Sequence, residues 1–194
     1  AVYLSDARAS GVKVLTPDIN VSVLDFAAVA AKDVPAEVAL PAGSPGAITF
    51  GLSAIRNVGD QLVRTLLEER DRNGPYASFH EFVERAPETV LNKRTVESLI
   101  KAGAFDGMGH PRKGLLMVFE QIIDSTLVRR RERDQGVMSL FGDMGAENDH
   151  GFDERVNIPA HEFDKSDRLK FEKEMLGLYI SDHPLLGVEA ALRR

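Results

Sequence analysis

The chain has 194 residues, of which 43% are hydrophobic and 28% charged, and its formal net charge is −6. This composition is that of a folded globular protein with room for one domain or two small ones. The acidic balance argues against a protein that coats nucleic acid over most of its surface, the absence of cysteine excludes disulfides and thiolate zinc sites, and no apolar run is long enough to cross a membrane.

Short β-strands are predicted near the N-terminus, after the tail of a helix that ends at Gly11. Val12 and Val14 alternate with polar residues, which favours a strand. A second strand is predicted within residues 21–31 and a third at residues 47–50, with a loop rich in Ala, Pro and Gly between them. We expect these strands to form a small antiparallel sheet.

A helix, a tight turn and a second helix are predicted over residues 51–72. Four apolar residues form one stripe on the second helix, which Gly74 ends. The turn has the pattern apolar-x-Gly-apolar-Gly, with Asn57 in the place of the first glycine, and Asn and Gly are the residues that tolerate a positive φ angle. This pattern is typical of the helix-hairpin-helix, a unit that binds DNA independently of its sequence. An ordinary pair of packed helices is the alternative.

The predicted turn leaves backbone N–H groups at the start of the second helix without partners inside the helix. These donors, together with the positive end of the helix dipole, suit a phosphate oxygen. We therefore predict that the turn and the first residues of the helix contact DNA. The predicted contacts are Arg56, Asn57, Val58, Gly59 and Gln61.

Further helices follow the first unit. Ser78 and Glu81 have the spacing of a capping box, and Asn92 is a suitable cap for the next helix. A long helix is predicted from about Pro111 to Asp134, with one continuous apolar stripe that makes it the main packing element of this half.

A second turn between helices is predicted near Gly103, and we interpret it as a degenerate helix-hairpin-helix. Two such units pack about a pseudo-twofold axis, so that both turns can reach the two strands of a duplex. The alternative is that Gly103 and Gly107 only cap helices. Residues 92–114 hold five basic and two acidic side chains, which favours phosphate contact. The predicted contacts at this turn are Lys101, Gly103, Ala104, Arg112 and Lys113.

Residues 135–164 are predicted to form a flexible acidic linker, because residues 143–154 hold five acidic side chains and neither Lys nor Arg. Met138, Leu140 and Phe141 are isolated apolar residues within it. Such residues either pack onto their own domain or enter a pocket of a partner, where few side chains can carry most of the affinity.

Two helices are predicted after the linker. The first covers residues 166–176 and is closed by Gly177, and the second begins at Pro184. Because the first and last predicted helices run into the ends of the chain, we expect the chain to be an excised piece of a larger protein.

Six ordered segments cover essentially the whole chain, and the fourth and sixth do not follow from generic helix chemistry. They are VLTPDIN, ITFGLSAIRNVG, GPYASFHEF, LIKAGAFD, SLFG and EKEMLGLYISDHPL. Together they resemble the alpha subunit of bacterial DNA polymerase III, a C-family replicative polymerase. The resemblance implies a cytoplasmic DNA-directed DNA polymerase that uses Mg²⁺ and works on double-stranded DNA with a sliding clamp and other replisome subunits. It leaves the replicative and lesion-tolerant versions open.

The resemblance also implies a mainly α fold with a tandem helix-hairpin-helix domain and a small antiparallel β element near the N-terminus. Residues 1–46 would be the end of the fingers domain and residues 47–134 the tandem helix-hairpin-helix domain. Residues 135–164 would be the linker, and residues 165–194 would form helices that lead to a following domain.

Catalytic residues are not expected in this chain. The family's catalytic carboxylates include an Asp-x-Asp pair, which this sequence lacks, and two-metal phosphoryl transfer needs clustered carboxylates. The five histidines show no close pairing at helical spacing, so no metal site stands out. We therefore expect no cofactor in this piece, although Mg²⁺ is expected in the parent polymerase.

The family's internal clamp-binding peptide has Gln, two variable residues, an apolar residue and Phe directly before Gly. Leu140, Phe141 and Gly142 fit this pattern, whereas Val137 stands in the place of the Gln. Two hypotheses follow from these observations. The first is that the chain is a duplex-binding segment of a polymerase, the second is that it is an interaction module that docks the sliding clamp, and the two are compatible in one polypeptide. The residues of the predicted clamp peptide are Met138, Ser139, Leu140 and Phe141.

Overall fold

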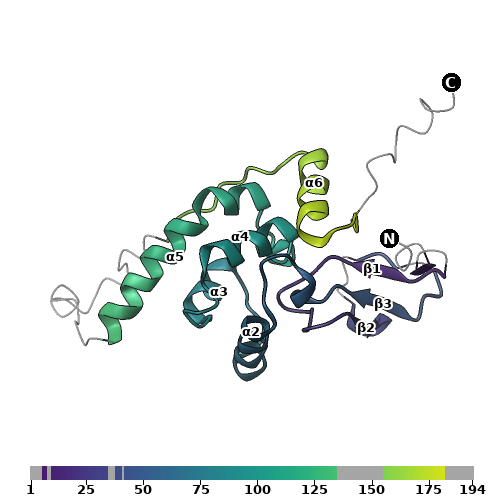
Figure 1. Cartoon of the computed structure of the whole chain (residues 1–194), viewed down its shortest axis with the longest axis horizontal. Coiled ribbons are helices and arrows are strands. Elements are labelled where there is room, and N and C mark those ends of the chain that lie inside the picture. The colour runs from purple at the N-terminus through teal and green to yellow at the C-terminus, as the bar shows by residue number, and fades with distance from the viewer. Residues whose placement is uncertain (1–5, 8–9, 35–37, 41, 135–154, 182–194) are drawn as a thin grey trace, which may run out of the picture.

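The structure is a computed structural model of the chain, and it describes residues 6–7, 10–34, 38–40, 42–134 and 155–181. Figure 1 shows a small sheet at one end of the molecule, a body of helices in the middle, and helix α5 extending to the other end. The predicted mainly α fold class is confirmed. The predicted clamp peptide and the helix predicted from Pro184 lie outside the described residues.

The sheet has three strands in the order β1-β3-β2. Strand β1 pairs with β3 in parallel, and β2 pairs with β3 in antiparallel register, with Ile48 of β3 opposite both Val14 and Ala28. The prediction of a purely antiparallel sheet is therefore wrong. The chain between β1 and β3 is long enough to cross over and return in the same direction. The strands are β1 Lys13–Leu15, β2 Ala27–Ala30 and β3 Gly46–Thr49.

The second strand is shorter than predicted, because residues 21–26 are not extended into the sheet. The carbonyl of Val23 instead accepts the N–H of Leu52 at 3.0 Å, and that of Leu24 accepts the N–H of Ser53 at 3.1 Å. These bonds attach the segment before β2 to η2, which precedes the first predicted hairpin turn. The sheet and the helices are thereby joined through their backbones.

The first helices have the ends that the sequence predicts. Gly74, with φ of 85°, follows α2, and the Ser78 hydroxyl accepts the N–H of Glu81 to cap α3. The segment from Gly51 to Ile55 is a single turn of 3-10 helix. The elements are η1 Ala31–Asp33, η2 Leu52–Ala54, α2 Asp60–Asn73 and α3 Phe79–Arg85.

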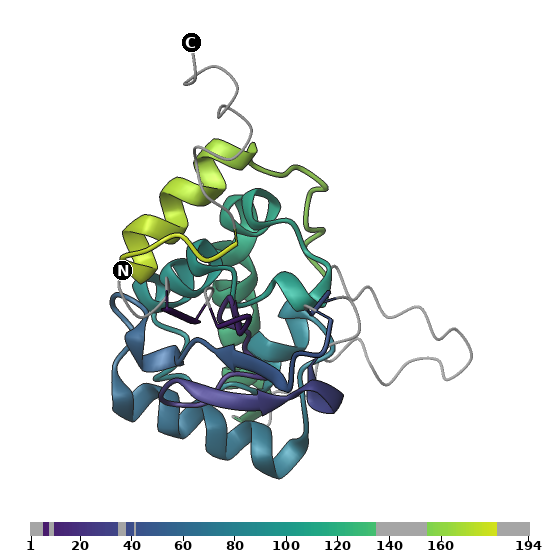
Figure 2. The ribbon, with the colours of Figure 1, turned by 90° about the vertical axis from the view of Figure 1, so that its right-hand side faces the viewer.

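The later helices are also close to their predicted limits. Asn92 caps α4 by accepting the N–H groups of Arg94 and Thr95, and Gly103 and Gly177 end α4 and α6 in the left-handed conformation. The elements are α4 Lys93–Ala102, η3 Asp106–Met108, α5 Arg112–Asp134 and α6 Lys165–Leu176. Figure 2 shows α2 along the lower edge of the molecule and α6 along the upper edge, on either side of the sheet.

One apolar core joins the helices, and four aromatic rings form its centre. Phe79, Phe82 and Phe105 are buried, with ring centroids 4.9 to 5.9 Å apart, and Tyr76 packs on Phe82. The predicted stripe of α5 faces this core through Leu115, Phe119, Ile122 and Ile123. Among the described residues no helix is both long enough and apolar enough to span a membrane.

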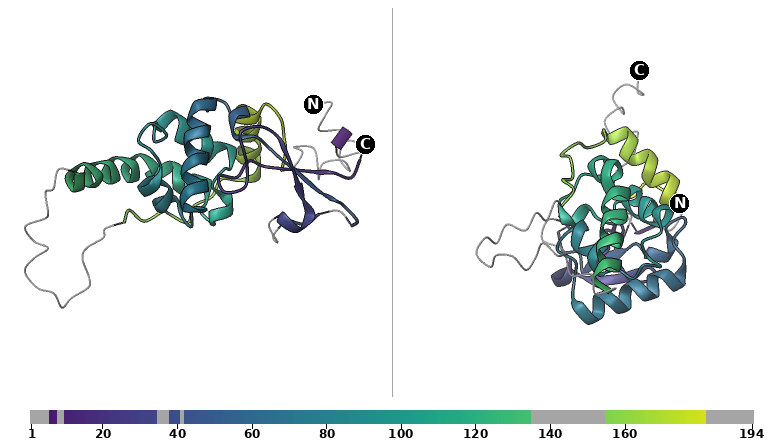
Figure 3. Two further views of the ribbon diagram at one scale, coloured as in Figure 1. Left: turned by 90° about the horizontal axis from the view of Figure 1, so that it is seen from below. Right: turned by 90° about the vertical axis from the view of Figure 1, so that its left-hand side faces the viewer.

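Residues 155–164, here called the strap, are the described part of the predicted linker. The strap runs along the helical body, past α5, to α6 (Figures 1 and 3). The carbonyl of Val156 bonds His80 Nε2 at 2.9 Å, and the carbonyl of His161 accepts the N–H of Gly114 at 2.9 Å. Apolar residues of the strap pack against the core, and residues 135–154 of the predicted linker lie outside the described residues. The division of the chain into domains stays a prediction.

Candidate nucleic-acid interface

In the first turn, residues 55–59, one of the two residues that tolerate a positive φ angle adopts it. Asn57 has φ of 65° and is the only non-glycine residue with positive φ among those described. Gly59 is extended, with φ of −88°. Arg56, Asn57 and Gly59 are exposed, whereas the side chain of Val58 is buried in the core. Of the predicted contacts at this turn, Val58 could therefore offer only its backbone.

The start of α2 presents free backbone donors. Gly59 is the N-cap and supplies no side-chain hydrogen bond, and the first bond of the helix runs from the N–H of Val63 to the carbonyl of Gly59 at 3.1 Å. Within the described part of the chain, the N–H groups of Asp60, Gln61 and Leu62 have no acceptor. A Cβ added at Gly59 would meet no protein atom within 4 Å. The surface is therefore open on the side from which an anion approaches α2.

The charges around this turn are mixed. Arg56 and Arg64 are exposed and form no ion pair with any described residue, and the same holds for Arg94 at the start of α4. Asp60, in the first turn of α2, is the opposing charge, because an acid there favours the helix but repels phosphate. Asp60 thus lies directly at the open amides, while three arginines without an ion pair among the described residues lie on the turn, on α2 and at the start of α4.

Among the described residues, three hydrogen bonds attach the first turn to other helices. Asn57 Nδ2 donates to Ser98 Oγ at 3.1 Å, and Thr95 Oγ1 donates to the carbonyl of Asn57 at 3.2 Å, so two bonds attach the turn to α4. The third comes from another direction, because the N–H of Arg56 donates to the carbonyl of Met175 in α6 at 2.9 Å. The position of the turn therefore depends on both helices.

The second turn, residues 103–111, is built differently. Gly103 has φ of 87°, and the N–H groups of Gly103 and Ala104 bond carbonyls of α4 at 3.0 Å. The carbonyl of Ala104 accepts the N–H of Ile19 at 2.8 Å. Gly103 and Ala104 are buried, with their amides already bonded. This arrangement matches the alternative that Gly103 caps a helix, whereas Gly107 lies inside η3 and caps none.

Arg112 is also buried, with 1% of its surface exposed. Its guanidinium makes a paired contact with the Asp106 carboxylate, through Nη2 at 2.7 Å and Nε at 3.0 Å, and Nη1 donates to the carbonyl of Lys101 at 3.2 Å. The prediction that Gly103, Ala104 and Arg112 contact DNA is therefore corrected, since none of them reaches the surface.

The start of α5 already holds an anion. The carboxylate of Glu162 in the strap accepts the N–H groups of Arg112 and Lys113, at 3.1 and 3.3 Å. Lys113 is exposed and lies over the ring of Phe163, whereas Lys101 pairs with Glu97 at 2.7 Å. The two predicted lysines therefore remain near the surface, but the amides beside them are occupied.

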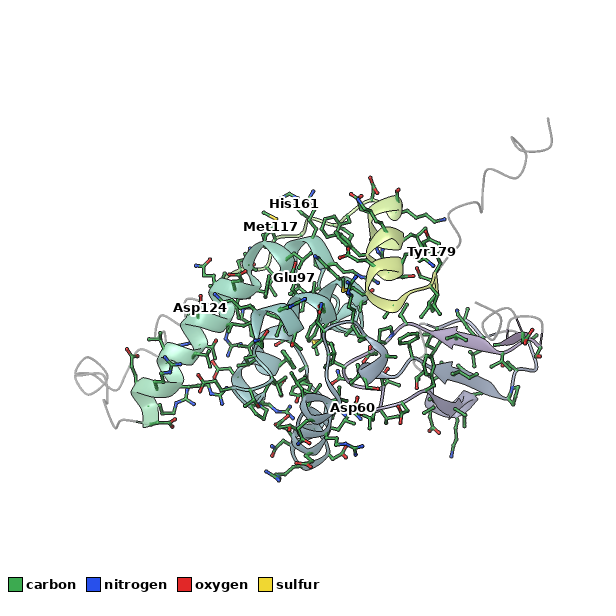
Figure 4. All side chains as sticks on the ribbon, viewed as in Figure 1. Asp60, Glu97, Met117, Asp124, His161 and Tyr179 are labelled. Atoms are coloured by element: carbon green, nitrogen blue, oxygen red, sulfur yellow. The ribbon has the colours of Figure 1, made fainter. Side chains whose placement is uncertain are left out.

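The starts of α2 and α5 do not lie together. Figure 4 shows Asp60, at the start of α2, in the lower part of the helical body. His161, which bonds the first turn of α5 through Gly114, lies at the upper edge. Only the first turn therefore combines an exposed corner, free amides and unpaired arginines.

Residues 11–115 match the helix-hairpin-helix motif family, and this stretch contains both turns. The chain belongs to the helix-hairpin-helix family. Within this stretch the first turn is exposed at Arg56, Asn57 and Gly59, whereas Gly103 and Ala104 of the second turn are buried.

Nearly the whole chain is also similar to named proteins. It is 42% identical over 188 residues to the DNA polymerase III subunit alpha of Mycobacterium leprae, which covers 97% of this chain and 14% of that protein. The subunit of Saccharopolyspora erythraea is 41% identical over 195 residues, with 99% and 15% covered, and that of Thermus aquaticus is 39% identical over 186 residues, with 96% and 13% covered. The chain thus spans 13–15% of the length of these relatives.

Some residues of the interface were not singled out from the sequence. Arg94 lies within the basic stretch noted there, and Arg64 lies one helical turn after Asp60, so both could have been found by placing them on the predicted helices. Glu162 and Met175 are more than 100 residues from the first turn, and no local pattern points to them. The described residues contain no group of three or more His, Cys, Asp or Glu side chains that could hold a metal ion.

Proposed function

We propose that this helix-hairpin-helix protein binds double-stranded DNA through phosphates at its first turn, without regard to base sequence. The observation that carries the proposal is the open start of α2, where three amide N–H groups lack acceptors among the described residues and no protein atom would touch a Cβ at Gly59. A phosphate oxygen satisfies such donors and gains from the helix dipole.

Arginine side chains support the same proposal. Arg56, Arg64 and Arg94 have no acidic partner among the described residues, so they can neutralise phosphates without first breaking an ion pair. With two or three phosphates neutralised, the logarithm of affinity should fall against the logarithm of salt with a slope of about −2 to −3. Because the Gly103 and Ala104 amides of the second turn are already bonded, this slope should be less steep than that of a protein in which two such turns bind phosphate.

The sharpest test replaces Gly59 by Ser. A serine at the N-cap accepts the N–H of the second or third helical residue and stabilises the helix by a few tenths of a kcal/mol relative to glycine. The same hydroxyl then competes with phosphate for those amides. We expect Gly59→Ser to raise the melting temperature slightly and to weaken binding of a 20-base-pair duplex at low salt by about tenfold, the value of one lost bond to a charged group.

Charge variants supply the control. Asp60→Asn removes the acid beside the open amides and should strengthen duplex binding, whereas Glu132→Gln removes one negative charge from the far end of α5 and should leave it unchanged. Equal effects of the two charge variants, or undiminished binding by Gly59→Ser, would refute a phosphate site at the first turn.

For the whole protein we propose template-directed DNA synthesis in the cytoplasm, with Mg²⁺ held by carboxylates outside the described residues. The relatives named DNA polymerase III subunit alpha support this proposal. This segment would then hold duplex DNA for the polymerase and would not catalyse the reaction itself.

Docking of the sliding clamp through Met138–Phe141 stays a proposal from the sequence. Leu140→Ala combined with Phe141→Ala should abolish clamp association in a pull-down with purified clamp, while leaving duplex affinity unchanged. Clamp association that survives in the double variant would exclude this peptide.

A further inference from the structure

Helix α6 is in direct contact with the first turn. The N–H of Arg56, in the exposed turn, donates to the carbonyl of Met175 at 2.9 Å, and Met175 itself is buried in the last turn of α6. α6 packs along α4, the other helix that holds the turn. Any displacement of α6 would therefore release one of the three bonds that fix the turn.

A buried charge network holds α6 in this position. Glu172 of α6 is fully buried, and its Oε2 accepts the N–H groups of Ile180 and Ser181, both at 3.1 Å. Its Oε1 has no hydrogen-bond partner among the described residues and lies 3.8 Å from Nη2 of Arg112. A buried carboxylate without a cation is strongly unfavourable, so the guanidinium is the group that makes the burial of Glu172 tolerable.

The second turn is shaped to receive this guanidinium. A Cβ at Gly103 would lie 2.2 Å from Nη2 of Arg112, so only glycine leaves the necessary space. Asp106 in the same turn supplies the paired carboxylate, and the carbonyl of Lys101 accepts from Nη1. Of the residues expected to meet DNA at this turn, Gly103 and Ala104 are buried, and the carbonyl of Lys101 accepts from Arg112.

We infer that the second turn is a socket which, through Arg112 and Glu172, seats α6 and so positions the first turn for phosphate. The part of this inference that concerns phosphate rests on the proposed function, whereas the positioning of Arg56 can be measured without DNA. Arg112 is in this account a positioning residue that never touches the ligand.

The test replaces Glu172 by Gln in the 194-residue chain. Gln keeps an acceptor for the two amides but loses the attraction to Arg112. The control is Val83→Ala in α3, a buried position away from α6, which lowers stability without touching the network. The two readouts are hydrogen exchange of the Arg56 amide, by nuclear magnetic resonance, and affinity for a 20-base-pair duplex at low salt.

We expect Glu172→Gln to speed exchange of the Arg56 amide about tenfold relative to Val83→Ala at matched distance from the melting temperature. Duplex binding should weaken about three- to tenfold, because a less ordered turn must be fixed on binding. Should Glu172→Gln not fold, Leu169→Ala in α6, also buried, serves the same comparison.

Two results are distinguishable. Equal Arg56 exchange in the α6 variant and in Val83→Ala overturns the positioning inference, whatever happens to DNA binding. If the Arg56 amide exchanges more slowly in wild type than in the α6 variant but wild type does not bind the duplex, the positioning inference holds and the proposed function is refuted.

Discussion

Glu162 Oε2 accepts the backbone N–H of Arg112 at 3.1 Å, across fifty residues of sequence. The other carboxylate oxygen accepts the N–H of Lys113. The side chain therefore fills the start of α5 as an N-cap residue or a bound anion would. The start of α2 has no such acceptor within the part of the chain that the structure describes, so of these two helix starts only that of α2 has amides free for a phosphate.

Glu162→Ala should lower the free energy of unfolding by about 1 kcal/mol, the usual cost of a lost helix cap. Urea denaturation of the purified chain measures it. Glu162→Gln retains an acceptor for one amide and should lose clearly less. Equal losses in the two variants would contradict a capping role for this carboxylate.

Gly114→Ala should destabilise the protein, although the same change inside an ordinary helix stabilises it by roughly 0.5–1 kcal/mol. The reason is the strap, because a Cβ at Gly114 would lie 1.9 Å from the carbonyl oxygen of Pro159. We expect a loss of about 2 kcal/mol or more as the strap is forced off α5. The measurement is thermal melting, and Val128→Ala, at an exposed site on the same helix, is the control. A higher melting temperature for Gly114→Ala would show that the strap does not lie on α5.

Local signals in the sequence predicted the helices well. Ser78 and Asn92 cap helices by accepting nearby amides, and Gly103 ends one in the left-handed conformation, because each depends on atoms within a few residues. The positive φ of Asn57 belongs to the same class of prediction. Residue type alone decides such features, so a single sequence carries them.

The function of a charged side chain was harder to predict, because it depends on distant partners. Arg112 and Lys113 are adjacent and basic, yet the first is buried and the second exposed. Arg112 is buried because it pairs with Asp106, six residues away, and lies near Glu172, sixty residues away. No local pattern predicts that the helix of Glu172 packs there. The parallel pairing of β1 with β3 was missed for the same reason, because register between distant strands is set by the whole chain.

Stability should also fall in mild acid through His110. Burial, and secondarily the nearby His80, lower the pKa of His110 below its ordinary value, and its Nε2 has no hydrogen-bond partner among the described residues. The unfolded chain therefore takes up the proton first, so the contribution of neutral His110 is complete above about pH 6.5 and is lost as the pH falls through the lowered pKa.

The comparison with His110→Gln measures this contribution. Melting temperatures at pH 7.5 and pH 5.5 should differ more for wild type than for His110→Gln, since Gln binds no proton in either state. Identical pH dependence of the two proteins would mean that His110 titrates alike when folded and unfolded.

Asn57 combines a left-handed backbone with a side-chain bond, and two variants separate these contributions. Asn57→Gly keeps the φ of 65° accessible but loses the bond to Ser98, so we expect a loss of stability of about 1 kcal/mol. Asn57→Val adds the steric cost of a β-branched residue in that conformation, a further 1–2 kcal/mol or so. Ser98→Ala removes this bond together with the bond from Ser98 Oγ to the carbonyl of Arg94, so it should lose at least as much stability as Asn57→Gly. Urea denaturation gives the three values, and duplex binding at low salt should be weakest for Asn57→Val because the turn itself is distorted. If Asn57→Val proved as stable as Asn57→Gly, the turn would not hold a left-handed residue, and the amides after it would not point where a phosphate can reach them.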